Sequence, residues 1–468
     1  MSLYPQPPNF ATVLRSFGSA EGLPFADALT EQDIQKACDA EGVCFGDGDG
    51  DVYTPAVTLW AFLAQCLSAS KSCVAAVARV LVLRVALGLP PCAAGTGAYC
   101  KARVKLPETL LQRLTLQAGA AVEDEAPDSW RWKGRHVYLA DGCEQSMPDT
   151  PANQKEYPQQ KTQKPGLGFP RLRLVVLLAF ATACLVGAAI GPCKGKGCGE
   201  TELFRSLLDR LRAGELVVAD RYYCTWWLIA LLADRGVDAC FRLHHKRHYD
   251  FTKGRQLGNG DHVVQWAKPS CPEWMDEQTY QGLPAYVEVR EVQVVVKQRG
   301  FRVRQFVAAT TLLDYGRYSS EDIADLYHHR WHVELDIRNI KQTLQMDILS
   351  CKTPAMIRRE VWAHLLAYNL VRKVLAQAAL AGQVTPRQLS FAGAVHTLDA
   401  FRWLLAVGSV QDSTPMMQAL LVAVATHRVG NRPDRVEPRE VKRRWKKAKL
   451  MMKARAQRRA ELLAGIGV

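Results

Sequence analysis

The sequence predicts an α/β protein whose mixed sheet is interrupted by a β-rich insertion and flanked by helical segments at both ends. Two short apolar runs, 137–140 and 216–219, each lead directly into an Asp and have the length of buried strands. Between 244 and 314 the pattern changes to β-like runs separated by turns rich in Gly and Pro. The segments before 120 and after 353 instead carry the apolar spacing of helices.

The composition is that of a globular chain with an unusual charge. Of 468 residues, 48% are hydrophobic and 23% are charged, but the formal net charge is +14. This balance indicates an extended polyanion such as nucleic acid as partner; the alternative is a soluble basic protein without one. The 14 cysteines show no paired metal-ligand spacing, and no signal sequence precedes them, so we expect reduced thiols in a cytoplasm.

The first 125 residues are predicted to be mainly helical. A short helix is expected at 31–40, and a Thr-Pro cap then opens helices over 55–68 and 71–87. The stretch 95–103 is expected to open a third helix with basic residues on one side. This arrangement is compatible with a helix-turn-helix that reads DNA, and equally with the core of a helical bundle. In the first case the contacting residues are Tyr99, Lys101, Arg103 and Lys105.

The apolar run 174–190 approaches the minimum length of a membrane helix. It is rich in small residues and splits at 181–183 into two pieces of strand length. The run therefore predicts a buried β-hairpin in the sheet that carries Asp141, and not a membrane span.

A turn rich in Gly and Lys follows this hairpin. It lacks the spacing of a Walker phosphate loop. Lys194 and Lys196 are candidates to contact a DNA backbone, with a plain turn as the alternative. A helix over 200–212 then leads to the strand that ends at Asp220.

The stretch 322–346 contains no Gly or Pro and is predicted to form one helix after an N-cap at Ser319 or Ser320. At about 100° per residue, four polar side chains fall within an arc of roughly 60° at the border of the apolar face. These residues are Tyr327, Arg330, Glu334 and Lys341. A solvated face with ordinary ion pairs is the alternative interpretation.

This spacing resembles the Tyr-x2-Arg-x3-Glu-x6-Lys signature of DDE transposases of the insertion sequence four (IS-four) family. Two upstream blocks extend the resemblance: HVYLADGCEQSMPDT, which carries Asp141, and GELVVADRYYCTWW, which carries Asp220 and Arg221. An Asp after a strand is otherwise commonly a turn or cap residue. The resemblance implies an RNase H-like catalytic domain with a carboxylate triad formed by Asp141, Asp220 and Glu334.

The resemblance also implies that this triad holds two Mg²⁺ or Mn²⁺ ions, with Asp141 bridging them; hard cations of this kind prefer oxygen ligands. One ion would activate water and later the freed 3′-hydroxyl, and the other would stabilise the leaving oxygen. Tyr327, Arg330 and Lys341 are implied to grip the phosphates near the scissile bond.

Three further groups are candidate DNA contacts. Arg221 would add a phosphate contact or balance the acidic cluster. Trp266 or Trp274 in the insertion would hold a flipped base, against the alternative of ordinary packing. Between Arg432 and Arg459 there are 13 Lys or Arg residues and three acidic residues. We interpret this segment, which includes Arg443 and Arg444, as a contact to the DNA backbone rather than a solvated tail.

The predicted domain limits follow from these elements, and the identity of each domain is what the resemblance implies. The domains are a helical N-terminal DNA-end-binding domain at 1–125, an RNase H-like catalytic domain in two parts at 126–243 and 315–381, a β-rich insertion at 244–314, and a helical basic C-terminal region at 382–468.

The resemblance therefore implies a metal-dependent DNA transposase that cuts an insertion sequence at its terminal inverted repeats and joins the 3′-hydroxyl ends to target DNA. It is expected to act as a homodimer on double-stranded DNA, in a bacterial cytoplasm and associated with the nucleoid. Two alternatives stay open. One is a transposase-derived DNA-binding regulator without catalysis, against which the intact triad argues. The other is a DNA nuclease that cuts without joining.

Overall fold

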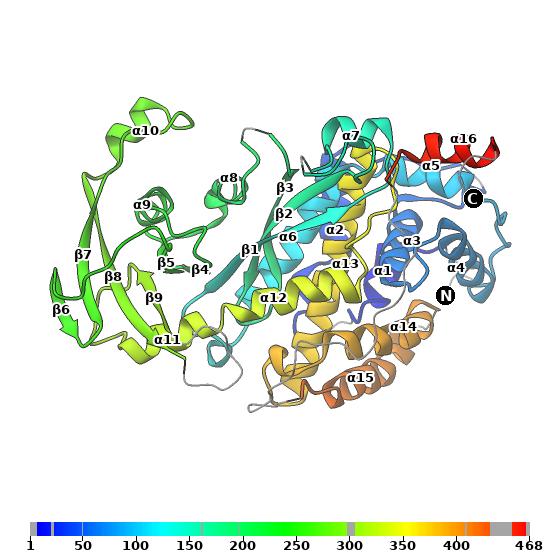
Figure 1. Ribbon diagram of the computed structural model, residues 1–468. Helices are drawn as coiled ribbons and strands as arrows, with labels where there is room; N and C mark the ends of the chain where they lie inside the picture. The colour runs from blue at the N-terminus through cyan, green and yellow to red at the C-terminus, as the bar shows by residue number, and fades with distance from the viewer. Residues whose placement is uncertain are drawn as a thin grey trace, which may run out of the picture.

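The computed structural model describes residues 7–19, 23–48, 50–160, 162–195, 197–296, 305–407, 410–430 and 452–464. Within them, nine strands form one sheet in the order β3-β2-β1-β4-β5-β9-β8-β7-β6 (Figure 1). The strands are β1 Val137–Ser146, β2 Arg171–Ala179, β3 Leu185–Pro192, β4 Leu216–Ala219, β5 Asp238–Arg242, β6 Arg255–Gly258, β7 Asp261–Ala267, β8 Tyr286–Val295 and β9 Gln305–Thr310. The mixed α/β class is confirmed.

The sheet combines antiparallel and parallel pairs. β2 is antiparallel to both β1 and β3, which confirms the predicted hairpin. β4 runs parallel to β1, and β5 runs parallel to β4. β9 is antiparallel to β5 on one side and to β8 on the other. The strands between 244 and 314 therefore continue the main sheet, and β9 pairs with strands of both parts.

Successive residues of the strands point to opposite faces of the sheet and pack in two hydrophobic cores, one on each face. Leu139 and Val218 pack in the core that includes Val333 of the helix α12 (Trp331–Arg338) and most of the other helices. Ala140 and Ala219 pack in the second core, with α8 (Glu200–Arg205) and α9 (Trp226–Asp234).

Most helices of the first core come from the two ends of the chain and lie together at one end of the molecule, with β6–β9 at the other (Figure 1). They are α1 Phe10–Arg15, α2 Glu31–Ala40, α3 Pro55–Leu67, α4 Cys73–Ala86, α5 Gly97–Lys105, α6 Glu108–Asp124, α13 Pro354–Ala381, α14 Phe391–Val407 and α15 Val410–Thr426. The remaining helices are α7 Pro151–Glu156, α10 Glu277–Gly282, α11 Ser320–His328 and α16 Arg455–Leu463. None of the helices described here combines the length and apolarity that a membrane crossing requires.

The central helix α13 is tied to α6 and to the sheet by one buried amide. Asn369 of α13 accepts a hydrogen bond from the backbone N–H of Leu185 at 2.8 Å and donates to the carbonyls of Thr115 and Leu185 at 2.8 Å each. The helix α6 crosses β3 at Gly119, where an added Cβ would lie 2.0 Å from the Leu185 oxygen. The two helices and β3 are therefore fixed to one another at this crossing.

The prediction of one helix over 322–346 was wrong. The helix α11 ends at His328, α12 begins at Trp331, and a π-helical turn covers Asn339–Thr343. At the break the ring of His329 packs 4.9 Å from that of Phe180 in the β2–β3 turn. The helix expected over 200–212 is likewise shorter, because α8 gives way to a 3-10 turn at Leu208–Arg210.

Candidate active site

Asp141 and Asp220 lie at neighbouring positions on one face of the sheet. Leu139 of β1 pairs in register with Val218 of β4. Asp141 lies two residues after Leu139, and Asp220 lies two residues after Val218. Because side chains two residues apart point to the same face of a sheet, the two carboxylates share a face. β4 ends at Ala219, whereas β1 continues to Ser146. Asp141 therefore lies where β1 has lost its neighbour on the β4 side. This is an accessible position for a reacting group.

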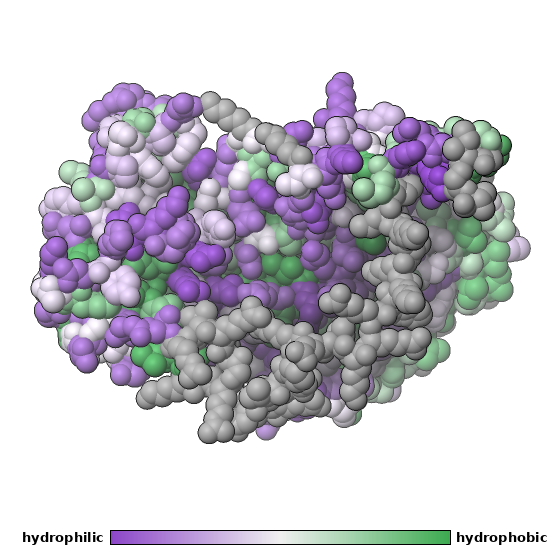
Figure 2. Space-filling view, viewed as in Figure 1, coloured by the Kyte–Doolittle hydropathy of each residue, from purple (hydrophilic) through white to green (hydrophobic). Residues whose placement is uncertain are grey.

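The helix α12 brings the third predicted carboxylate to the same face. The Arg330 guanidinium donates from Nη2 to Glu334 Oε1 at 2.5 Å, and its Nη1 lies 3.9 Å from Asp141 Oδ2. The structure thus brings Asp141, Arg330 and Glu334 together, with Asp220 beside Asp141. In the space-filling view, hydrophilic residues gather across the middle of this face, over α12 and the ends of β1 and β4 (Figure 2).

The environment of Asp141 opposes its charged form. The pKa of Asp141 is raised to about 6, mainly by burial and to a smaller extent by the carboxylates of Asp220 and Glu200. The N–H of Gly142, which donates to Asp141 Oδ1 at 2.8 Å, and the Arg330 guanidinium act in the opposite direction. The negative charge of the cluster is therefore incompletely compensated by the protein.

The other residues of the predicted polar arc surround this cluster. Lys341 Nζ donates to the carbonyl of Glu144 on β1 at 2.9 Å. Tyr327 is 7% exposed, and its ring lies 4.8 Å from that of Phe306. Burial is the main cause that raises the pKa of Tyr327, and the nearby Asp220 adds to it. Arg221 is partly exposed, with its guanidinium 5.7 Å from the ring of Tyr222.

Several candidate DNA contacts lie away from the carboxylates. Arg103 is 9% exposed, donates to Gln65 Oε1 at 3.2 Å and lies over the Phe62 ring, so its contacts are those of a core residue. Lys105 and Lys194 are exposed. Lys196, Arg443 and Arg444 lie outside the described residues.

The two tryptophans differ in exposure. Trp266 is 4% exposed, donates from Nε1 to Glu291 Oε1 at 3.1 Å and is covered by Arg247 at 3.7 Å. This environment is that of a packed ring. Trp274 is 42% exposed and stacks under Arg205, with the guanidinium 3.7 Å from the ring centre.

Two residues beside the cluster, Glu200 and Tyr223, were not predicted from the sequence. Glu200 was expected only as the start of a helix, and no motif marks it. Tyr223 follows Asp220 by three residues, but its spacing alone does not distinguish it from a core aromatic. Their position depends on how α8 packs against β2 and β3, which is a tertiary contact.

The donor set fits a hard divalent cation. Among the described residues, no three Asp, Glu, His or Cys side chains are already arranged around one metal position. The chemistry of the cluster is nevertheless that of oxygen ligands for Mg²⁺ or Mn²⁺, since Asp141, Asp220 and Glu334 supply carboxylates and burial leaves Asp141 poorly compensated.

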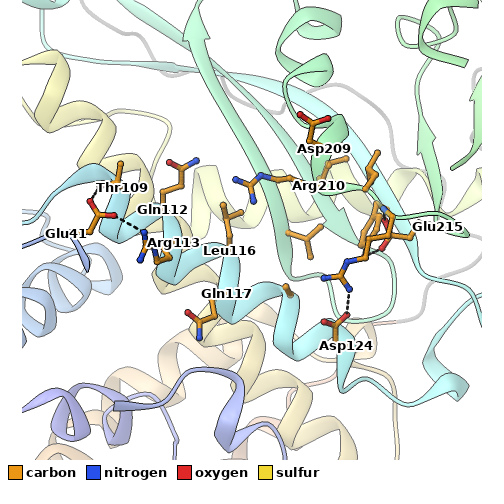
Figure 3. A pocket seen from close by; sticks show the side chains of 16 residues that line it. Glu41, Thr109, Gln112, Arg113, Leu116, Gln117, Asp124, Asp209, Arg210 and Glu215 are labelled. Atoms are coloured by element: carbon orange, nitrogen blue, oxygen red, sulfur yellow. Dashed lines mark hydrogen bonds and ion pairs between the residues drawn. The ribbon is translucent and has the colours of Figure 1, made fainter. Parts of the chain in front are cut away.

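A cavity of about 690 Å³ lies elsewhere, between α6 and the segment that precedes β4 (Figure 3). Its charges are largely balanced within the protein: Arg113 pairs with Glu41 at 3.1 Å and Arg212 lies 3.9 Å from Asp124. It holds none of the predicted site residues.

Residues 132–370 match the family model described as "Transposase DDE domain". Because this match covers more than half of the 468 residues, the chain belongs to that family. The predicted transposase class is thereby confirmed. The family implies a DNA-cleaving enzyme that depends on divalent metal ions.

Two relatives illustrate the likeness. The chain is 27% identical over 353 residues to the transposase InsG for insertion sequence element IS4 of Escherichia coli strain K12, covering 75% of this chain and 77% of that protein. It is 32% identical over 81 residues to the transposase for insertion sequence element IS421 of Escherichia coli, covering 17% and 22%. Among solved structures, the piggyBac transposase synaptic complex with hairpin DNA is similar at a TM-score of 0.44 with 7% identity, covering 92% of this chain and 88% of that chain.

Proposed function

We propose that this protein is a transposase of the insertion sequence four family that cuts DNA at the terminal inverted repeats of its element and joins the 3′-hydroxyl ends to target DNA. The observation that carries the proposal is the convergence of the predicted triad. Asp141 and Asp220 share one face at the end of β4, and Glu334 lies across the Arg330 guanidinium from Asp141.

In this proposal Asp141, Asp220 and Glu334 hold two Mg²⁺ or Mn²⁺ ions. When bound, these ions would supply charge stabilisation for the crowded anionic transition state of phosphodiester attack. Arg330 lies at the same place and offers a planar fork to a phosphate. Lys341 and Arg221 add positive charge around it, and Tyr327 lies three residues before Arg330, with its ring against Phe306. These four residues would position the DNA end.

The strand order supports an RNase H-like assignment for the catalytic part. An antiparallel β1-β2-β3 meander is followed by β4 and β5, which run parallel to β1. We further propose the domain limits given above, a homodimer that pairs two DNA ends, and action on double-stranded DNA in a bacterial cytoplasm. Lys105, Lys194, Lys196, Arg443 and Arg444 are proposed as contacts to the DNA backbone.

Purified protein incubated with a DNA fragment that carries the flanks of the gene, with Mg²⁺ or with EDTA, tests the proposal. We expect Mg²⁺-dependent 3′-hydroxyl ends at the element boundary and joined products with target DNA. Asp141→Asn, Asp220→Asn and Glu334→Gln should each reduce cleavage by at least about 1,000-fold, because each removes a carboxylate that the reaction needs. Melting curves would verify that the variants are folded.

The products separate the alternatives. Cut ends without joined products would identify a nuclease. Sequence-specific binding without cleavage, unchanged by the three substitutions, would identify a regulator. The exposed Asp347 provides a matched control, since Asp347→Asn lies outside the cluster and should cleave like the wild type.

A further inference from the structure

Glu200 approaches the catalytic strand from the face opposite α12. It is the first residue of α8, and its side chain rests directly on Gly142, the residue after Asp141. A Cβ added at Gly142 would lie 2.6 Å from Glu200 Cδ and 2.9 Å from Glu200 Oε1. Only glycine at this position lets the carboxyl group come so close to β1.

The part of β1 that has no neighbouring strand on the β4 side allows the Glu200 carboxyl group to reach the carboxylate cluster from the face of the sheet on which α8 lies. β4 pairs with β1 only as far as Leu139 and ends at Ala219. Beyond that point no strand of the described chain covers the β4 side of β1. Carboxylates from the two faces of the sheet can therefore meet at this edge, although Asp141 and Gly142 point to opposite faces.

The charges of the three groups interact. Asp220 and Glu144 raise the pKa of Glu200, after the larger effect of burial, and Glu200 in turn acts on Asp141. The cation that faces Glu200 is Arg173, whose Nε lies 3.9 Å from Glu200 Oε1 and whose Nη2 donates to Glu144 at 3.2 Å. The guanidinium is shared, so it compensates Glu200 only partly.

Tyr223 supplies an independent indication of a ligand at this place. Its side chain is fully buried, and its hydroxyl has no hydrogen-bond partner in the part of the chain that the structure describes. Burial raises the pKa of Tyr223, and the carboxylates of Glu200, Asp141 and Asp220 raise it as well. Its ring packs edge-on against Phe204, one helical turn after Glu200, at 5.3 Å.

A buried hydroxyl without a partner costs roughly 1–3 kcal/mol, so folded proteins rarely keep one unless something else binds it. The Tyr223 side chain lies close enough to Glu200, Asp141 and Asp220 for their charges to act on its hydroxyl, and these carboxylates repel one another. A cation with its bound water satisfies both requirements, because the cation neutralises the carboxylates and the water donates a hydrogen bond to the hydroxyl oxygen.

We propose that Glu200 is a fourth carboxylate of the catalytic centre, which binds the divalent cation together with Asp141 and Asp220, and that Tyr223 orients its bound water. The role of this cation in catalysis rests on the proposed function, whereas the binding of the cation by Glu200 can be tested without DNA.

Isothermal titration of the full-length protein with Mn²⁺, without DNA, tests it. We expect Glu200→Gln to weaken Mn²⁺ binding by about 10-fold or more, because removal of a residue that supports a metal costs 10- to 100-fold in affinity. The matched control is Glu202→Gln, which changes a carboxylate of the same helix that instead pairs with Arg205 at 3.9 Å. It should bind within about twofold of the wild type, because surface pairs contribute little.

Two further variants keep the test sharp. Glu200→Asp replaces Glu200→Gln in the test if the latter does not fold. It keeps the charge but shortens the side chain, so it should also weaken Mn²⁺ binding. Tyr223→Phe keeps the packed ring and removes the hydroxyl. It should weaken binding by about threefold without lowering the melting temperature, because the unpaired hydroxyl does not stabilise the protein without the cation.

The outcomes distinguish this inference from the proposed function. Unchanged Mn²⁺ affinity in Glu200→Gln, with binding lost in Asp141→Asn, would overturn the role of Glu200 and leave the triad intact. Weakened binding in Glu200→Gln, in a protein that cuts no DNA, would support the site and overturn the proposed function. A wild-type protein that binds no Mn²⁺ would overturn both.

Discussion

Arg330 and Glu334 form an ion pair of 2.5 Å at the start of α12, and the same guanidinium lies 3.9 Å from Asp141. One cation thus connects two carboxylates that come from elements almost 200 residues apart in the sequence. We predict that Arg330→Gln reduces DNA cleavage by about 100-fold or more, because a charged donor directed at the reacting phosphate has an effect of this size. Arg330→Lys should recover part of the activity, since it keeps the charge but loses the fork.

Cleavage rates at saturating Mg²⁺ would measure this effect. The control is Arg338→Gln, which removes an exposed arginine from the last turn of the same helix. If Arg330→Gln cleaved as fast as this control, Arg330 would have no role in catalysis.

The second prediction concerns a buried ion cluster behind the active site. Asp336 of α12 is 2% exposed and accepts from Arg372 at 2.6 Å and from Arg387 at 2.9 Å. Asp336→Ala leaves the buried Arg372 and the partly buried Arg387 without their carboxylate partner and should lower the free energy of unfolding by about 3–5 kcal/mol. Urea denaturation would measure it, with the exposed Asp347→Ala as the control. A loss below 1 kcal/mol would show that the cluster behaves like a surface pair.

The third prediction sets helix propensity against packing. Replacing Gly by Ala in a helix favours folding by about 1 kcal/mol where space permits. At Gly119 the new Cβ would lie 2.0 Å from the Leu185 oxygen and 2.6 Å from Asn369 Nδ2, so Gly119→Ala should instead destabilise the protein by about 1–3 kcal/mol or more. At Gly97 nothing lies within 4 Å, so Gly97→Ala should be neutral or slightly stabilising. Equal melting temperatures for the two variants would refute this account.

The fourth prediction is a pH dependence that arises from Lys373. Its side chain is 1% exposed, its ammonium donates to Ser19 Oγ, and burial lowers its pKa to about 7, with Glu125 acting in the opposite direction. Below pH 7 both the folded and the unfolded protein carry the proton, so the full cost of burying the charge is present. Above pH 7 only the unfolded protein still carries it, so this cost falls by about 1.4 kcal/mol per pH unit.

Lys373→Met should therefore be more stable than the wild type at pH 6–7, and this difference should shrink as the pH rises to 9. Urea denaturation of both proteins at each pH would measure it. A difference that stays constant with pH would show that Lys373 keeps its charge in the folded protein.

The sequence predicted those parts of the fold and site that depend on local signals. The apolar runs before Asp141 and Asp220 marked buried strands, and the split in 174–190 marked the hairpin. The break near His329 was missed because it depends on packing against Phe180, which lies 149 positions earlier in the chain. Periodicity within one segment carries no information about that contact.

The burial of Arg103 shows the same limit. Basic residues on a short helix near the N-terminus fit a DNA-binding surface as well as they fit a core. Arg103 pairs with Gln65 of a preceding helix, 38 residues away. Which face of a helix is covered is decided by its neighbours, and the sequence of that helix does not reveal them.

The pairing of β9 with both β5 and β8 has a practical consequence for protein engineering. An insertion that folded by itself could be excised and the chain rejoined. Here, removal of 244–314 would strip β5 of its antiparallel neighbour and leave a row of unpaired backbone groups beside the catalytic strands. Exposed strand edges of this kind recruit other chains, so a shortened protein should precipitate rather than remain a smaller working enzyme.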